Sequence, residues 1–215
     1  MTAFRYDAAM PRAKQRTPEM RERVLQVAMD MLASDGVAEF TTRRLAQHAG
    51  TSTPAVYELF GDKAGLVREV FFESFRLLGQ YLHEVRPSQD PRGELISVIE
   101  SLRMFAREHP ALTDLMFSRP FADFDPGPAE RRAGDEVRLF IVAVVRRCVH
   151  AGVLEGDEVD IAHVIVAMAQ GLAVQETAGW LGTSQESRDR RWDLAVTALL
   201  DGLRPASGGE SACGS

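Results

Sequence analysis

Apolar residues recur at helical spacing along most of the chain, and this periodicity constrains the fold more than any other feature. The stripes begin near Met20 and end at Leu203, interrupted by Gly and Pro. No stretch alternates apolar and polar residues for long enough to form a strand, and no internal repeat is visible. The sequence therefore predicts an all-α fold.

Capping residues and helix breakers divide the stripes into separate helices. Thr17, Thr41 and Asp62 each precede a periodic stretch and are predicted N-caps, and either Ser52 or Thr53 caps the third helix. The seventh helix is apolar almost all round over 137–149, which predicts that it lies in the middle of a bundle. The predicted helices cover residues 17–34, 42–48, 53–60, 63–85, 92–108, 110–117, 130–150, 158–181 and 185–203.

Composition favours a globular protein, with 45% hydrophobic and 26% charged residues in 215. No apolar run reaches the ~18 residues that span a bilayer, and no signal-peptide pattern is visible, so we expect no membrane and a cytoplasmic location. Cys148 and Cys213 lack metal-ligand spacing, and a disulfide between them is not expected.

The charge is distributed unevenly along the chain. Residues 1–63 hold 9 Lys/Arg and 8 Asp/Glu, a net of +1, whereas residues 64–215 hold 16 and 23, a net of −7. A mildly basic head on an acidic body orients a protein toward a polyanion, although the overall charge of −6 argues weakly against nucleic acid.

Residues 36–67 contain two short amphipathic helices joined by a tight turn, the layout of a helix that reads a DNA groove. Ala46, Gly50 and Val56 have the required spacing: a small residue where the helices cross, a residue tolerant of unusual dihedral angles at the turn, and a branched residue in the crossing. Leu45, Ala49 and Leu59 complete the predicted core.

The opposite face of the third helix is predicted to meet DNA. Thr53, Pro54 and Ala55 at its N-terminus can touch base edges, and the Tyr57 hydroxyl can bond a phosphate. Thr42, Arg43 and Lys63 lie at the starts of neighbouring helices, where phosphates are favoured. The alternative is that two helices simply pack together, with Tyr57 in the core; for Phe60 we prefer the core.

The stretch TTRRLAQHAGTSTPAVYELFGDKAGL, with the preceding helix VLQVAMDMLASDG, resembles the N-terminal domain of the TetR family of bacterial transcriptional regulators over residues 17–75. The resemblance implies an all-helical homodimer that binds palindromic operators, usually represses, and is released by a ligand in its C-terminal domain. It assigns DNA contacts to Thr42, Arg43, Thr53, Pro54, Ala55, Tyr57, Glu58 and Lys63.

Aromatic and methionine side chains in the C-terminal part are candidates for lining a ligand cavity, because both commonly line apolar pockets. Ordinary core packing is the alternative for each of them. The Pro-rich loop 118–129 is a special case, since a solvent-exposed loop has little reason to carry two Phe. The predicted ligand residues are Met104, Phe105, Met116, Phe117, Phe121, Phe124, Met168 and Gln170.

The segments AREHPALTDLMFSRPFADF and AHVIVAMAQGLAVQETAG resemble a C-terminal subclass of the same family named for a Trp-His-Gly signature. This chain keeps Gly171 but has Val166 and Gln170 near the expected Trp and His, so most of the signature is missing. Gln170 can bond a ligand or a neighbouring helix.

The last two helices are predicted to form a homodimer surface, in which small residues allow close approach and Trp192 is an anchor. Two copies would form a four-helix bundle, with the heads one DNA turn apart, ~34–36 Å. The alternative is a monomer that buries the same stripes internally. The predicted interface residues are Ala167, Gly171, Ala178, Trp192, Val196 and Leu199.

No arrangement of His109, Asp114 and Ser118 indicates catalysis, and we expect no catalytic residues, no cofactor and no metal. The sequence predicts a flexible arm (1–16), a three-helix helix-turn-helix DNA-binding domain (17–62), a larger helical-bundle ligand and dimerisation domain (63–204) and a disordered tail (205–215). The function predicted is that of a ligand-responsive transcriptional repressor whose partners are an operator duplex, a small-molecule effector and a second copy. The alternatives are a helical small-molecule-processing enzyme or a protein-interaction module, each with a vestigial helix-turn-helix.

Overall fold

A computed structural model of the protein describes residues 17–36, 39–117, 128, 132 and 134–206. All the regular secondary structure of these residues is helical, which confirms the predicted fold class. The elements are α1 (Pro18–Asp35), α2 (Thr42–His48), α3 (Thr53–Phe60), α4 (Lys63–His83), α5 (Pro91–Glu108), α6 (Pro110–Phe117), α8 (Asp135–His150), α9 (Glu158–Thr177) and α10 (Gln185–Gly202).

The first four helices begin at the residues that local sequence predicts. The side-chain oxygens of Thr17, Thr41 and Ser52 each accept a hydrogen bond from the backbone N–H three residues further on, at 3.3 Å. Asp62 does the same at 2.7 Å. Of the two predicted caps of α3, Ser52 is the one used, and Thr53 is the first helical residue. Each cap satisfies a donor that the helix cannot pair internally.

Helix α9 ends earlier than predicted, at Thr177 instead of residue 181. Ala178 is the C-cap, and Gly179 follows with a φ of +77°, a conformation that turns the chain away from the helix axis. The N–H groups of Trp180 and Leu181 then both donate to the Gln175 carbonyl, at 2.9 and 3.0 Å. A glycine-dependent turn, invisible to apolar periodicity, therefore sets this boundary.

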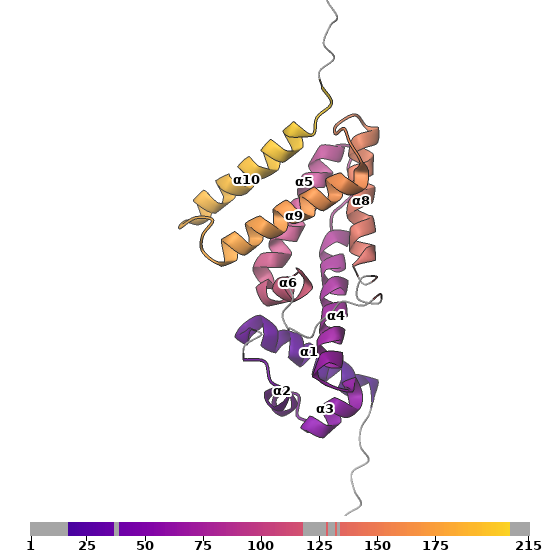
Figure 1. Ribbon diagram of the computed structural model, residues 1–215, viewed down its shortest axis with the longest axis vertical. Helices are drawn as coiled ribbons and strands as arrows, with labels where there is room; N and C mark the ends of the chain where they lie inside the picture. The colour runs from indigo at the N-terminus through magenta and orange to yellow at the C-terminus, as the bar shows by residue number, and fades with distance from the viewer. Residues whose placement is uncertain (1–16, 37–38, 118–127, 129–131, 133, 207–215) are drawn as a thin grey trace, which may run out of the picture.

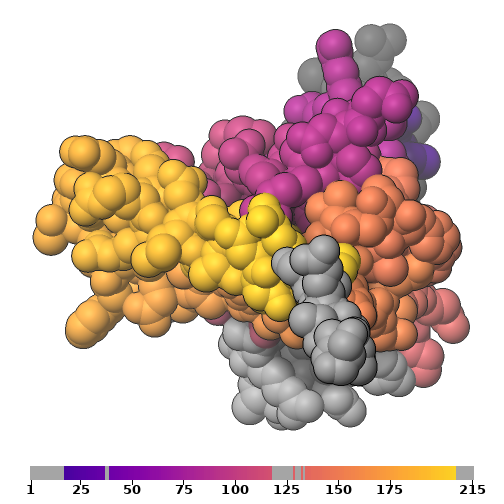
Figure 2. Space-filling view, turned by 90° about the horizontal axis from the view of Figure 1, so that it is seen from above, coloured from indigo at the N-terminus to yellow at the C-terminus, as the bar shows by residue number. Residues whose placement is uncertain are grey.

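The helices form a small head and a larger body joined by α4. Helices α1, α2 and α3 pack together at one end of the molecule (Figure 1). Helix α4 starts beside α3 and continues into the body, where it packs against α5, α6 and α8. Helix α1 contacts both α4 and α6, so the head touches the body through two elements. Helix α10 lies outside α9 and projects from one side of the molecule (Figures 1 and 2).

The centre of the body is α5, and the prediction that the seventh helix fills it is wrong. Helix α5 packs against α4, α6, α8 and α9, and its Leu95, Val98 and Phe105 are fully buried. One side of α8 instead faces solvent, and its Leu139 side chain is 57% exposed. Charged residues of α8 also face its neighbours at one edge: Arg146 bonds Glu158 on α9, and Arg147 bonds the buried Glu94 on α5.

Candidate functional site

The head is built around the crossing of α2 and α3. Ala46 and Val56 are buried where the two helices meet, as their spacing predicts. Gly50 in the turn has a φ of +64°, which a residue with a Cβ rarely adopts. Phe60 is buried at the end of α3, and the guanidinium of Arg21 from α1 lies 5.2 Å from its ring centroid. These contacts fix the orientation of α3 relative to α1 and α2.

The outward face of α3 carries the residues predicted to read DNA. Pro54 and Glu58 are exposed, Thr53 and Ala55 are half-buried, and the Tyr57 side chain is 42% exposed. They lie along the first two turns of α3, where the helix N-terminus also presents backbone N–H groups. A short helix with such an exposed N-terminal face can enter a major groove.

Of the four predicted phosphate contacts, Tyr57, Arg43 and Lys63 have exposed side chains. Arg43 lies at the start of α2 and Lys63 at the start of α4, on either side of α3 in the sequence. Thr42 requires a correction, because its side chain is only 7% exposed and faces the head core. Thr42 can therefore offer a phosphate its backbone N–H in the first turn of α2, but not its hydroxyl.

Arg44, next to Arg43, has a structural role instead. Its Nη2 donates to Asp35 of α1 at 2.7 Å, and its Nη1 donates to the Glu39 carbonyl at 3.0 Å. Of the two adjacent arginines, Arg44 therefore ties α2 to α1, whereas the Arg43 side chain is exposed. The sequence alone does not distinguish the two.

The junction between α3 and α4 is too tight for any residue but glycine at position 65. A Cβ added there would lie 2.0 Å from the Phe60 carbonyl oxygen, which is backbone and cannot move aside independently. The first turn of α4 therefore presses directly on the end of α3.

The body contains cavities between α4, α5, α6 and α9. One of them, of about 600 Å³, is a groove open to solvent between α5–α6 and α9. A narrow space of about 20 Å³ lies beside it, and a mostly apolar, partly open cavity of about 150 Å³ lies between α4, α5, α8 and α9. Phe117, the last residue of α6, lines all three.

The predicted ligand residues divide into three groups. Phe117 and Gln170 line the groove, and Phe105 lines the narrow space next to it. Met116 is buried, Met168 is half-buried and Met104 is 43% exposed, and none of the three lines these cavities. Phe121 and Phe124 lie outside the described residues. Thr113 and Asp114 of α6 also line the groove, although sequence reasoning missed both as ligand residues.

A hydrogen-bonded tyrosine links α4 to the corner between α5 and α6. The Tyr81 hydroxyl donates to the Glu108 carboxylate and lies 3.0 Å from Nε2 of His109. Burial, together with the hydrogen bond and charge of Glu108, raises the pKa of Tyr81 to about 12. Tyr81 therefore stays protonated and joins α4 to the turn from which α6 begins.

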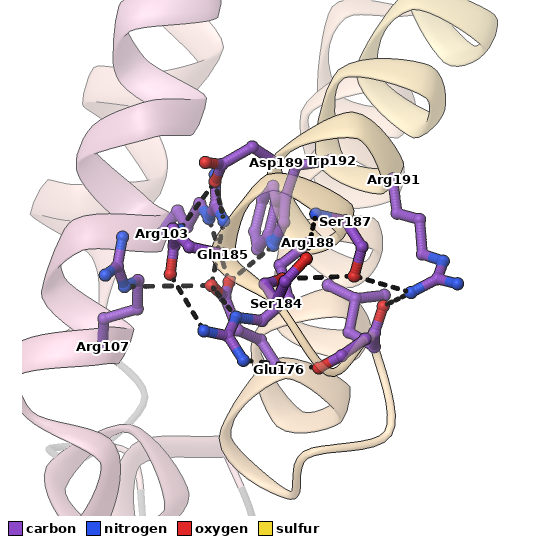
Figure 3. Close-up of polar contacts among 12 residues, drawn as sticks. Arg103, Arg107, Glu176, Ser184, Gln185, Ser187, Arg188, Asp189, Arg191 and Trp192 are labelled. Atoms are coloured by element: carbon purple, nitrogen blue, oxygen red, sulfur yellow. Dashed lines mark hydrogen bonds and ion pairs between the residues drawn. The ribbon is translucent and has the colours of Figure 1, made fainter.

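A buried carboxylate holds α10 against the body (Figure 3). Both oxygens of Glu176 on α9 accept hydrogen bonds from Arg103 on α5, at 2.9 Å each, and Nε1 of Trp192 on α10 donates to it at 2.7 Å. Arg107 and Arg188 each lie 3.8 Å from the same carboxylate. Burial raises the pKa of Glu176, but the hydrogen bonds and charges of these partners outweigh it and leave the pKa below its ordinary value.

Trp192 is therefore not the surface anchor that the sequence predicts. Its side chain is 3% exposed, because the indole stacks under the Arg103 guanidinium at 4.9 Å and bonds Glu176 within the same protomer. Val196 is likewise buried and Leu199 half-buried, whereas Ala167, Gly171 and Ala178 are exposed. Large apolar side chains that the sequence did not single out are exposed on and between the last two helices: Val164, Val174, Trp180 and Leu194.

Within the described part of the chain, no cluster of His, Cys, Asp and Glu side chains is arranged to hold a metal ion. In the same residues, no helix combines the length and apolarity that crossing a membrane requires. Cys148 is buried, and its thiol donates to the Pro91 carbonyl at 3.1 Å.

These features define a class of protein: an all-helical DNA-binding protein whose helix-turn-helix is joined by α4 to a bundle with cavities. A family model described as bacterial regulatory proteins, tetR family, matches residues 24–70. A second, described as a tetracyclin repressor-like C-terminal domain, matches residues 95–199. The chain belongs to the TetR family and is a DNA-binding transcriptional regulator.

Individual relatives agree with this assignment. The nucleoid occlusion factor SlmA of Haemophilus influenzae is 24% identical over 192 residues, covering 85% of this chain and 87% of that protein. The class A tetracycline repressor from transposon 1721 in Escherichia coli is 31% identical over 157 residues, covering 73% and 66%. A solved protein of unknown function from Rhodococcus sp. RHA1 superposes with a TM-score of 0.76 at 25% identity, covering 89% of this chain and 98% of that one.

Proposed function

We propose that this regulator is a cytoplasmic repressor that binds a palindromic operator as a homodimer and is released by a small apolar or amphipathic molecule. The observation that carries the proposal is the position of α6. One side of this short helix lines the 600 Å³ groove, and the helix also packs against α1 of the head. A molecule in the groove therefore touches an element that contacts the DNA-binding part directly.

We assign DNA reading to residues 17–62 and ligand binding and dimerisation to residues 63–204. Thr53, Pro54 and Ala55 contact base edges, and Tyr57, Arg43 and Lys63 contact phosphates. Glu58 accepts from a cytosine amino group, because a carboxylate is repelled by phosphates. The exposed side chains of α3 support this division. The arm (1–16) and the tail (205–215) belong to neither part.

The dimer surface is the exposed apolar stripe of α9 with the neighbouring face of α10. Val164, Ala167, Gly171, Val174 and Ala178 recur at spacings of three and four residues, and all are exposed. All but Val164 also line the groove, so a second copy packed on this stripe would cover the open side of the ligand site. Such a stripe matches the seam of a helical bundle, in which small residues let two helices approach closely. Leu194 on α10 is 69% exposed and supports a second copy packing against both helices.

Release follows from two contacts between body and head. A ligand in the groove favours one position of α6, which packs on α1, and of α4, which Tyr81 ties to the α5–α6 corner. Because α4 presses on α3 at Gly65, its displacement moves the two DNA-reading helices out of register with successive major grooves. The shift in the equilibrium can be no larger than the ligand's differential affinity for the two states.

Selection from random duplex pools at modest ionic strength tests the proposal. The expected result is a palindromic motif whose half-sites lie one helical turn apart, about 34–36 Å, protected by a dimer. Enrichment of no motif would remove the DNA-reading role of the head. A motif without twofold symmetry, or a monomer on the duplex, would remove the homodimer.

A second candidate function follows from the match with nucleoid occlusion factors over most of the chain. In that case the protein would act in nucleoid occlusion and not by repressing one promoter. Mapping bound chromosomal fragments separates the two, since a repressor occupies a few sites beside the genes it controls.

Two other classes of function make different predictions. A helical enzyme with a vestigial head predicts turnover and no salt-dependent binding to DNA. A protein-interaction module predicts that replacing Tyr57 or Lys63 leaves function intact.

A further inference from the structure

One arginine of the head contacts two other helices at once. Arg21 lies near the start of α1, where its side chain is half-buried. Its guanidinium lies over the ring of Phe60, the last residue of α3, at 5.2 Å from the ring centroid. The same guanidinium pairs through Nη2 with Glu69 of α4, at 2.7 Å. Arg21 therefore joins the end of the DNA-reading helix to both α1 and α4.

These two contacts bridge the junction at which α4 follows α3. Only Gly61 and Asp62 separate the two helices, and the Asp62 carboxylate caps α4. Helices α1 and α3 each pack on α2 and α4. The contact between Arg21 and Phe60 adds a direct connection between α1 and α3. The pair with Glu69 ties this connection to the second turn of α4.

The position of Arg21 differs from that of the predicted DNA contacts. Thr53 to Ala55 lie at the N-terminus of α3, whereas Phe60 lies at its C-terminus, about 10 Å further along the axis at 1.5 Å per residue. The guanidinium already has a carboxylate partner there. A planar guanidinium can stack on a ring and donate to a carboxylate at the same time, so arginine suits this place better than lysine does.

We infer that Arg21 is a positioning residue for DNA binding, which holds α3 in its DNA-reading orientation while α4 keeps its present position. This inference rests on the proposed function of the head and names a residue through which the position of α4 reaches α3. A displacement of α4 away from α1 separates Glu69 from Arg21, and the Phe60 ring then loses the cation that covers it. Loss of the ion pair therefore mimics release, with no ligand present.

Operator binding by Arg21→Gln and by Glu69→Gln tests this role. Binding of each full-length variant to the motif that the wild type selects is measured by fluorescence anisotropy over a series of salt concentrations. We expect both variants to bind about threefold to tenfold more weakly, because an exposed ion pair and a cation–π contact each contribute a factor of up to about five. The slope of log K against log salt should stay that of the wild type.

The signs of the two effects separate positioning from simple electrostatics. If charge alone mattered, removal of the cation at Arg21 would weaken binding to a polyanion, whereas removal of the anion at Glu69 would strengthen it. Stronger binding by Glu69→Gln would therefore overturn the inference. A slope that falls by about one unit in Arg21→Gln would make Arg21 a phosphate contact instead.

The double variant shows whether the two residues act through each other. In that case Arg21→Gln combined with Glu69→Gln should bind within about twofold of Arg21→Gln alone, whereas multiplied losses would show that they act independently. Arg146→Gln is the matched control, since Arg146 makes a similar pair between two helices of the body, with Glu158 at 2.6 Å. Equal weakening by Arg146→Gln would assign the loss to general destabilisation.

Amide hydrogen exchange of the free protein needs no operator and separates this inference from the proposed function. Both single variants should exchange the α3 amides about threefold to tenfold faster than the wild type, with the α9 amides unchanged. If α3 exchange is unchanged while the wild type selects a motif, DNA reading stands and the role of Arg21 is wrong. If α3 exchange rises but the wild type selects no motif, Arg21 positions α3 and the proposed DNA-reading role fails.

Discussion

The head and the body are specified in different ways. Each helix of the head, and α4 which follows it, begins at a side-chain cap three residues from its backbone partner. In the body, α9 and α10 also begin at side-chain caps, Asp157 and Ser184, but Asp90 and Gly134 precede α5 and α8 without any side-chain cap bond. Those helices are held by distant contacts instead, such as Arg103 with Glu176, 73 residues apart. Every helix of the head is therefore marked by a local cap, whereas α5 and α8 of the body depend on tertiary pairing.

This difference suits the two roles. A DNA-reading helix must keep one orientation. Short-range caps and a tight turn fix this orientation through contacts between residues close together in the sequence. A body that responds to a ligand needs elements whose relative positions can shift, and long-range polar contacts define such positions. The comparison predicts that the largest stability effects lie in the body and the most specific DNA effects in the head.

The largest expected effect is that of Glu176→Gln. The substitution keeps an acceptor for Trp192 but leaves the half-enclosed Arg103 without its main counter-charge. Loss of one partner of a buried ion pair costs about 3 kcal/mol, measured as the free energy of unfolding by urea titration. Glu186→Gln is the control: Glu186 is highly exposed and pairs with Arg190 at 3.7 Å, so a change below about 0.5 kcal/mol is expected. Equal effects of the two would show that α10 is not held by this cluster.

The same carboxylate should make the body sensitive to acid. Because the folded state lowers the pKa of Glu176 below its ordinary value of 4.5, its contribution is complete above that pH. The contribution is lost as the pH falls below 4.5 and through the lowered pKa. Urea titrations from pH 7 to pH 3 should show a shallower decline for Glu176→Gln than for the wild type. Parallel curves would contradict a charged Glu176 in the folded state.

A smaller effect is expected at the junction of head and body. Gly65→Ala places a Cβ against the Phe60 carbonyl, so α4 must move away from α3, at a cost of about 1–3 kcal/mol. DNA affinity should fall with stability, as read by fluorescence anisotropy and thermal unfolding. Gly79→Ala in the same helix meets nothing within 4 Å and should stabilise the protein by about 0.5–1 kcal/mol. Unchanged operator binding by Gly65→Ala would show that the junction does not orient α3.

The smallest effect on the fold, and the most specific to DNA, is that of Lys63→Ala. A phosphate contact contributes equally to all sequences, so binding to every duplex should weaken and the slope of log K against log salt should flatten by about one unit. Arg86→Ala, an exposed cation near the far end of α4, should leave the slope unchanged. A loss confined to the selected motif would assign Lys63 to base reading.

Substitution of Thr53 tests base reading, for which the expected pattern is the opposite of that for a phosphate contact. Thr53→Ala is expected to change the preferred base at one position by about 1–3 kcal/mol, while binding to unrelated duplex stays the same. Repeating the random-pool selection with the variant measures this change. Equal weakening on every sequence would move Thr53 from the bases to the backbone.

The sequence by itself determined the helices and the head. Apolar periodicity and cap residues located all nine helices in the described residues, and the spacing of Ala46, Gly50 and Val56 identified the helix-turn-helix, because these signals act over a few residues. Only the tertiary structure decided which groups meet across the chain. It buried Thr42 and Trp192, made α5 the centre of the body, and brought Asp114 and Phe117 to the same groove as Gln170. Burial and cavity lining depend on contacts between distant segments, which periodicity along one helix does not encode.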